Sequence, residues 1–277
     1  MGLTGESSVA IICKLTNSNG SQDHSVEGEF EKNSILASML PRDRARLAIR
    51  AERTELISRD TLEDDSQPDY ILFPVGGAVS IVHLSQGGNA VEVGIVGCEG
   101  MIGLGDLFGG LETSHRIMVQ GAGAAIRVPL DAFSEEFERG GRLREAVLRY
   151  ANFHMHQLSQ GAICNRLHTI EQRLARWLLL ISDRTRVDDL RVSQEFLSFM
   201  LGARRASVNE IVQKFKESGA LIHSRSRIRL ANKPALRNHS CECYRALTLA
   251  LASIGAPFPT LSADPVQKTY TASSAGL

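Results

Sequence analysis

The stretch VSQEFLSFMLGARRASVNEIVQKFKESGALI, residues 192–222, decides the fold of the C-terminal part of the chain. Ser193 is a typical N-cap residue, and the helix after it stops at Gly202, which suits a tight turn. A second helix follows the turn and ends at Gly219. Two short helices joined by a glycine-containing turn predict a helix-turn-helix, although the same pattern also occurs in plain helical bundles.

The second helix has an apolar face and a polar face. Val208, Val212 and Phe215 share one side with Ile211 and must pack against the first helix. The opposite side carries small and hydrogen-bonding residues, including Ala206, which could reach base edges in a major groove. We predict DNA contacts for Ser193, Arg204, Arg205, Ser207, Asn209, Glu210 and Gln213.

Residues 221–230, LIHSRSRIRL, alternate apolar and basic side chains. This alternation predicts a β-hairpin wing whose Arg225, Arg227 and Arg229 contact phosphates. The charge of the chain supports a polyanionic partner. Residues 166–245 contain 16 Lys and Arg against 8 Asp and Glu, whereas residues 1–165 contain 14 against 22. Double-stranded DNA is therefore the predicted partner.

Residues 54–130 have a different character. Six short β-rich runs alternate with turn residues, and nine glycines fall between Gly87 and Gly110. This pattern predicts a small barrel or sandwich, and the lack of alternating helices argues against a parallel α/β sheet. The pattern before it, residues 35–53, predicts a helix whose main part starts after Pro41.

A long helix is predicted over residues 142–166. An apolar stripe at spacings of three and four comprises Leu143, Val147, Tyr150, His154, Leu158 and Gly161. The stripe either packs on the chain's own barrel or forms the seam of a homodimer, and we predict the dimer. A further helix over residues 169–183 places Leu174, Trp177 and Ile181 on one face.

The predicted fold class is α+β, with five segments in chain order. These are a disordered N-terminus (1–28), a β-roll sensor domain of jelly-roll type (29–141), a dimerisation helix (142–166), a winged helix-turn-helix (167–245) and a disordered tail (246–277).

The order of these segments resembles the Crp/Fnr superfamily of bacterial transcription regulators over roughly residues 34–245. LGARRASVNEIVQKF is similar to that family's recognition segment, and GMIGLGDLFGG is similar to its phosphate-binding cassette. The resemblance implies a domain like a cyclic-nucleotide-binding domain, a homodimer on a near-palindromic operator, RNA polymerase as a partner and a small-molecule effector.

The cassette departs from the family's pattern. Leu104 stands where cyclic-nucleotide binders have a Glu, and Ser114 and His115 stand where they have an Arg and a Ser or Thr. The candidate effector pocket comprises Gly103, Leu104, Ser114, His115 and Arg116, and Arg116 could replace the missing Arg after a loop shift. Because a phosphate loses a strong charge-assisted pair without its Arg, we expect cyclic AMP not to be the effector. In the recognition helix, only Arg205 of the family's reading set is kept, followed by Ala206 and Glu210.

Other classes of function have less support. No nucleophile elbow or P-loop occurs, so an enzyme is not expected. The alternative is a cupin-like ligand or metal sensor with structural C-terminal helices, but residues 54–130 contain only His83 and His115 as histidines. No cofactor is expected, because Cys13 alone represents the N-terminal cysteines of an iron–sulfur sensor and no histidine stands out as a haem ligand.

Two further expectations concern metal ions and location. His239, Cys241 and Cys243 could share one face of an extended segment, but a fourth metal ligand is not evident, so simple packing is favoured and no metal site is predicted. The five cysteines do not suggest a disulfide framework, and no apolar run reaches the ~18 residues of a membrane span. A cytoplasmic protein is expected.

Overall fold

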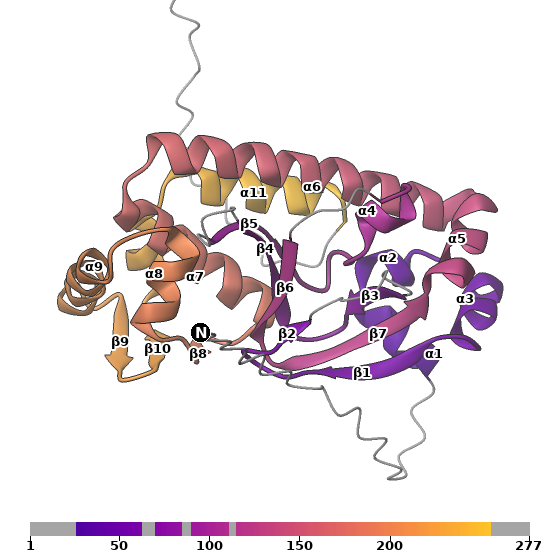
Figure 1. The fold of residues 1–277 in the computed structure, drawn as a ribbon, viewed down its shortest axis with the longest axis horizontal. Coiled ribbons are helices and arrows are strands. Elements are labelled where there is room, and N and C mark those ends of the chain that lie inside the picture. The colour runs from indigo at the N-terminus through magenta and orange to yellow at the C-terminus, as the bar shows by residue number, and fades with distance from the viewer. Residues whose placement is uncertain (1–25, 63–69, 85–89, 111–114, 256–277) are drawn as a thin grey trace, which may run out of the picture.

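The computed structural model describes residues 26–62, 70–84, 90–110 and 115–255 (Figure 1). The N-terminal elements are α1 (Val26–Glu29), η1 (Phe30–Lys32), α2 (Ser34–Ala37), α3 (Pro41–Ala48), β1 (Glu52–Leu56), β2 (Thr61–Leu62), β3 (Tyr70–Pro74), β4 (Ala78–Leu84), β5 (Ala90–Val96), α4 (Leu104–Leu107), β6 (His115–Gly121), β7 (Gly123–Pro129) and α5 (Leu130–Glu138). The C-terminal elements are α6 (Gly141–Leu167), α7 (Ile170–Thr185), β8 (Asp189–Leu190), α8 (Gln194–Leu201), α9 (Arg205–Glu217), β9 (Leu221–Ser224), β10 (Arg227–Leu230), α10 (Lys233–His239) and α11 (Glu242–Ser253).

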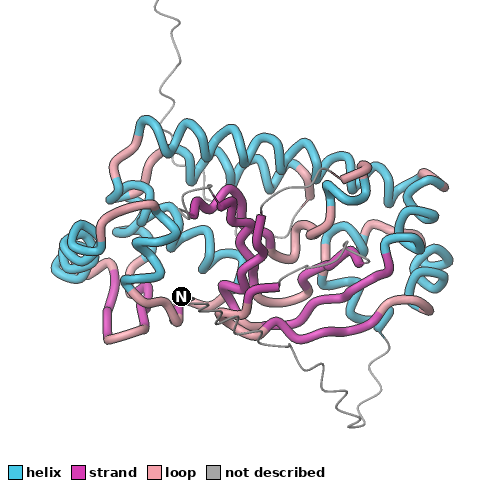
Figure 2. The backbone as a smooth tube through the Cα atoms, viewed as in Figure 1, coloured by secondary structure: helices cyan, strands magenta, loops and turns pink. Residues whose placement is uncertain are grey.

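The predicted β-roll consists of two antiparallel sheets. One has the strand order β1-β7-β3 and the other β2-β6-β4-β5. The first strand pairs with the last, because Glu52 lies opposite Arg127 and Leu56 lies opposite Gly123. All six β-rich runs seen in the sequence are strands, and only the two-residue β2 was not expected. Figure 2 shows these strands between the helices of the two ends of the molecule.

Helix α6 lies across the roll and connects it to the C-terminal helices. In Figure 1 it runs along the top of the molecule with α11 beside it. Leu143, Val147 and Tyr150 are buried, and the Tyr150 hydroxyl donates to the Met101 carbonyl oxygen over 3.1 Å. A Cβ atom on Gly100 would lie 2.2 Å from the Tyr150 ring, so only glycine lets the helix approach this closely.

One continuous core joins the roll to the C-terminal part, since buried residues from Phe30 to Leu251 form a single apolar cluster. Helix α7 supplies the polar links. The indole Nε1 of Trp177 donates to Glu92 Oε2 over 2.8 Å, and Arg184 Nε lies 2.7 Å from Glu99 Oε1 with both side chains fully buried. The helix begins at a capping box formed by Thr169 and Gln172.

Three expectations about segments are wrong in part. The predicted helix over residues 35–53 is two short helices followed by β1, and Ile49, the residue after α3, is 84% exposed. Residues 26–28, expected to be disordered, belong to α1. The expected disordered tail from residue 246 is helical to Ser253, because Leu247 and Leu251 are buried against the core. Residues 1–25 and 256–277 lie outside the described residues.

Candidate DNA-binding surface and sensor cavity

The helix-turn-helix forms as the sequence predicts. The Ser193 Oγ accepts a hydrogen bond from the Phe196 backbone N–H over 3.1 Å and caps α8. Gly202 ends α8 in the left-handed conformation at φ 57°. Helix α9 buries Val208, Val212 and Phe215 against the domain. The apolar face assigned from the sequence is therefore confirmed, and the other face of α9 is left for solvent.

The side chains predicted to read DNA lie mostly on that outer face. The exposed ones are Arg204, Arg205, Asn209, Glu210 and Gln213, whereas Ser207 is half-buried. Arg204 is the N-cap of α9 and Arg205 is its first residue. Neither arginine forms an ion pair within the part of the chain that the structure describes. Ser193 differs from the rest, because its hydroxyl already serves as the cap of α8.

The predicted wing is the hairpin of β9 and β10. Ile228 and Leu230 point into the domain, whereas Arg227 and Arg229 are exposed. Arg225 lies in the turn and is also exposed. Arg227 Nε is 3.8 Å from Asp189 Oδ1, a loose surface pair that leaves its guanidinium largely accessible. Figure 1 places α9 and the wing together at the end of the molecule away from α3. One end of the protein therefore presents a basic surface.

A second candidate site is a cavity of about 460 Å³ between the roll and α6. Gly103 and Leu104 line it, as predicted, together with Phe108, Tyr150 and His154. Burial lowers the pKa of His154, and its Nδ1 atom is buried without a hydrogen-bond partner among the described residues. The cavity thus offers a largely apolar lining with a neutral His154 imidazole, and His83 and Asp106 add two further polar side chains.

Of the other predicted pocket residues, Arg116 is the one whose side chain the structure describes. Ile117 lines the cavity, and its neighbour Arg116 is exposed, because successive side chains of a strand point to opposite sides. In this arrangement Arg116 points away from the cavity, so its role as a replacement phosphate ligand after a loop shift stays a prediction. His115 begins β6, and Ser114 lies outside the described residues. Among the described residues that line the cavity, none is Lys or Arg.

Comparison with known proteins identifies the C-terminal part. Residues 172–239 match the family model of the Crp-like helix-turn-helix domain. The chain carries a Crp-like helix-turn-helix in a Crp/Fnr fold. The matched residues include α8, α9 and the wing, so the basic surface belongs to this domain.

Solved structures of Crp/Fnr proteins share this fold over 68–78% of the chain. A candidate Crp/Fnr-family regulator from Eubacterium rectale matches with a TM-score of 0.61 and 11% identity, covering 78% of this chain and 99% of the other. FixK2 from Bradyrhizobium japonicum matches with a TM-score of 0.57 and 15% identity, covering 69% of this chain and 98% of the other. A Crp-family regulator from Thermus thermophilus matches with a TM-score of 0.56 and 17% identity, covering 68% of this chain and 96% of the other. No curated protein matches the sequence. At these identities the structures establish the Crp/Fnr fold.

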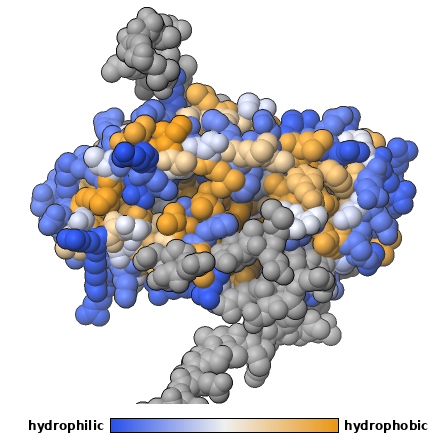
Figure 3. All heavy atoms as spheres, turned by 45° about the horizontal axis from the view of Figure 1, so that its top comes forward, coloured by the Kyte–Doolittle hydropathy of each residue, from blue (hydrophilic) through white to orange (hydrophobic). Residues whose placement is uncertain are grey.

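The outer face of α6 is the face that is free to form the predicted dimer seam. The inner stripe of Leu143, Val147 and Tyr150 packs on the chain's own roll, so it is not available as a seam. A different stripe faces solvent, with Leu148, Met155 and Leu158 exposed at 49%, 60% and 39%. Figure 3 shows apolar residues gathered across the middle of this side of the molecule and hydrophilic ones at its ends. The prediction of Leu143, Val147 and Tyr150 as seam residues is therefore wrong, whereas Leu158 is exposed and Gly161 has open space above it.

A third grouping lies where the long helix meets the Crp-like domain. Cys164, His168, Cys241 and Cys243 bring one ligand-type atom each to within 4.8 Å of one another. His239, which the sequence grouped with the two last cysteines, points elsewhere, because its Nδ1 lies 2.9 Å from Glu171 Oε1. The missed signal was the spacing of Cys164 and His168, four residues apart at a helix end.

No helix among the described residues is long and apolar enough to cross a bilayer.

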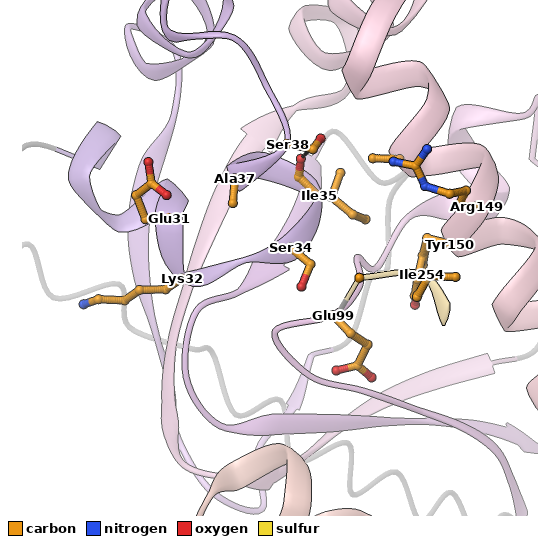
Figure 4. Close-up of a pocket in the computed structure, with 12 residues that line it drawn as sticks. Glu31, Lys32, Ser34, Ile35, Ala37, Ser38, Glu99, Arg149, Tyr150 and Ile254 are labelled. Carbon is orange, nitrogen blue, oxygen red and sulfur yellow. Dashed lines mark hydrogen bonds between the residues drawn. The ribbon is translucent and has the colours of Figure 1, made fainter. Parts of the chain in front are cut away.

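A cavity of about 410 Å³ lies where the N-terminal helices, the roll, α6 and the residues just after α11 meet (Figure 4). Glu99 from the roll, Tyr150 from α6 and Ile254 just after α11 all line it. Glu99 Oε1 is paired with Arg184 across the boundary between the roll and α7. We therefore regard this cavity as part of the joint between roll and helices.

Proposed function

We propose that the protein is a transcription regulator that binds double-stranded DNA as a homodimer through α9 and the wing. The observation that carries this proposal is the surface of the Crp-like domain. Helix α9 buries its apolar face and exposes Arg205, Asn209 and Gln213, with two wing arginines on the same end of the molecule. Arg and Asn side chains are suited to base edges in the major groove, and Arg also binds phosphates.

The exposed stripe of α6 supports the homodimer. Its residues repeat at alternating spacings of three and four, which is the a/d pattern of a coiled coil. The stripe comprises Leu148, Ala151, Met155, Leu158, Ala162 and Asn165. Pairing two copies along this stripe would bury apolar surface that one chain leaves in water, and a two-fold axis along it suits a near-palindromic operator. The two recognition helices would then enter major grooves about 34–36 Å apart.

The cavity beside α6 supports regulation by a small molecule other than cyclic AMP. A largely apolar ligand with one group that can hydrogen-bond to His154 Nδ1 fits its described lining. Tyr150 and His154 lie on the same helix as the exposed stripe. A ligand that contacts these two residues would therefore act directly on the helix that joins the two copies. RNA polymerase is the expected partner of the DNA-bound form.

The decisive experiment is selection of bound fragments from genomic DNA by the purified protein. A shared near-palindromic sequence among the selected fragments is the expected result. Retention on heparin and on duplex DNA at low salt is the simpler companion measurement, since DNA affinity through phosphates falls steeply with salt. If neither duplex DNA nor heparin retains the protein, α8 and α9 are structural helices and the cupin-like alternative takes precedence.

A further inference from the structure

The four side chains at the base of the Crp-like domain come from opposite ends of its sequence. Cys164 lies in the last turn of α6 and His168 is the C-cap of that helix. Cys241 is the N-cap of α11, and Cys243 lies in its first turn. All three cysteines are at most 4% exposed and form a buried cluster of their own. The cluster therefore closes a loop of chain that contains the whole helix-turn-helix.

We propose that Cys164, His168, Cys241 and Cys243 bind one zinc ion. Zinc takes four such ligands at about 2.3 Å for sulfur and 2.0–2.1 Å for nitrogen, in a tetrahedron. That geometry places two sulfur ligands about 3.8 Å apart and a sulfur and a nitrogen about 3.5 Å apart. The structure has 3.6 Å between Cys164 Sγ and Cys241 Sγ, and 3.4 Å between Cys243 Sγ and His168 Nδ1.

The same distances argue against other occupants. A disulfide needs about 2.05 Å between sulfur atoms, far less than the 3.6 Å between Cys164 Sγ and Cys241 Sγ. An iron–sulfur cluster places several metal and sulfide atoms among its ligands, so ligand atoms within 4.8 Å of one another are too close for it. Three soft thiolates and an imidazole do not suit magnesium or calcium, which prefer oxygen. A single soft or borderline cation remains.

The surroundings of the cluster are those of a metal site. The Nε2 atom of His168 lies 3.1 Å from Glu242 Oε1, so an N–H at Nε2 donates to the carboxylate and leaves the Nδ1 lone pair facing the sulfurs. The Gln160 Nε2 amide donates to Cys243 Sγ over 3.1 Å. Arg173 and Arg176 interact electrostatically with Cys164 and offset the negative charge of the thiolates. Both neighbours that zinc ligands commonly have, a carboxylate on the histidine and a donor to sulfur, are present.

The position of the site indicates a structural role. Four protein ligands and near-complete burial leave no open position for a substrate. His168 occupies the junction between α6 and α7, directly before the Thr169 cap of α7. An ion held there would fix the angle at which the Crp-like domain leaves the long helix, and would tie α11 to the same point. This inference does not depend on DNA binding.

Elemental analysis of the purified full-length chain tests the proposal. The chain is produced in zinc-supplemented medium and purified without chelators. About one zinc per chain is expected, and both Cys164→Ser and Cys243→Ser should lose it. Cys98→Ser is the matched control, because Cys98 lies in the roll outside the cluster. A wild-type protein without stoichiometric metal, iron with sulfide in place of zinc, or ligand variants that keep their zinc would each overturn the proposal.

Two measurements keep the test decisive if the cysteine variants fold poorly. Cobalt exchanged into the wild-type protein should show the thiolate charge-transfer bands of a tetrahedral site, and their absence would overturn the assignment. Glu242→Gln keeps every ligand but removes the carboxylate that orients His168. It should weaken zinc binding about 10–100-fold in a chelator competition, whereas an unchanged affinity would contradict the proposed geometry.

Discussion

Arg205 is the side chain on which we expect the reading of DNA bases to depend most. It is exposed in the first turn of α9, where side chains reach base edges most easily, and its guanidinium can bond guanine O6 and N7 together. Arg205→Ala should lower affinity for the selected operator by roughly 1–3 kcal/mol and affect a scrambled duplex much less. Arg227→Ala should weaken both DNAs about equally and flatten the salt dependence. Binding assays on both duplexes across a salt series measure this.

The control for these variants is Arg42→Ala, an exposed arginine of α3 in the N-terminal part of the chain. It should leave binding to both duplexes unchanged. Equal loss on both DNAs with Arg205→Ala would make Arg205 a phosphate contact and remove its role in reading bases.

The Glu99–Arg184 pair is a second feature at this scale. Both side chains are fully buried with 2.7 Å between Arg184 Nε and Glu99 Oε1. Arg184→Met alone leaves a buried carboxylate without its partner and should cost about 3–5 kcal/mol of unfolding free energy. Adding Glu99→Gln should recover much of that loss, because the double variant buries no charge. Urea unfolding of the wild type, both single variants and the double variant gives the coupling free energy between the two side chains. If the two single losses simply add in the double variant, the ion pair does not explain the loss in Arg184→Met.

Glu92 provides a pH-dependent prediction. Burial raises the pKa of this carboxyl above its ordinary value of 4.5, while hydrogen bonds from Ser80 and Trp177 act in the opposite direction. The folded state therefore holds this proton more tightly than the unfolded state does. Its contribution to stability is present below about pH 4.5 and is lost as pH rises through the higher folded-state pKa.

Glu92→Gln should accordingly be more stable than wild type at about pH 8, because the neutral amide can still accept from Trp177. The advantage should shrink as the pH falls toward 4.5, the ordinary value for this carboxyl. Thermal melting of both proteins across this range tests the trend. A stability difference that does not change with pH would contradict it.

At the scale of elements, the proposed homodimer depends on α6. Met155 is 60% exposed at the middle of the solvent-facing stripe. Met155→Glu would place two carboxylates against each other in a seam and should convert the dimer to a monomer at micromolar concentration. His156→Glu is the control, since His156 is also exposed but lies beside the stripe. Sedimentation or light scattering gives the masses, and a Met155→Glu variant that stays dimeric would exclude this seam.

The elements also show what a sequence can and cannot predict. The strands and both helices of the helix-turn-helix follow from local patterns that end at turns and caps, such as Gly202 and Ser193. The stripe of Leu143 and Val147 was visible too, but periodicity does not tell which surface an apolar stripe meets. Helix α11 was missed because no side chain caps its start at Cys241 and its apolar residues pair with distant helices.

The outer face of α9 could be predicted apart from the half-buried Ser207, because a helix that buries one face must expose the other. The cysteine cluster could not be assembled, because its two halves are 77 residues apart and only the path of α6 and α11 brings them together. The same holds for the cavity, where Arg116 and Ile117 could not be distinguished before the sheet fixed which of them points inward.

At the scale of the whole molecule, we expect DNA binding to be independent of cyclic nucleotides. The cavity has Leu104 where a ribose hydroxyl would need an acceptor, and no described residue of its lining is a Lys or Arg that could form a charge-assisted pair with a phosphate. Calorimetry with cyclic AMP and cyclic GMP should give no heat of binding, and neither should alter affinity for the operator. Submicromolar binding of either one would mean that the cassette rearranges to bring a cation into the cavity.

The two links from α7 to the roll have a consequence for how such a gene can change over time. Trp177 donates to Glu92, and Arg184 is paired with Glu99, each across 85 positions of sequence. A recombination that exchanged only the DNA-binding half with a distant relative would leave both carboxylates facing the wrong neighbours. Positions 92 and 177, and positions 99 and 184, should therefore co-vary among related proteins. New DNA specificities should arise by substitution on α9 more readily than by recombination between genes.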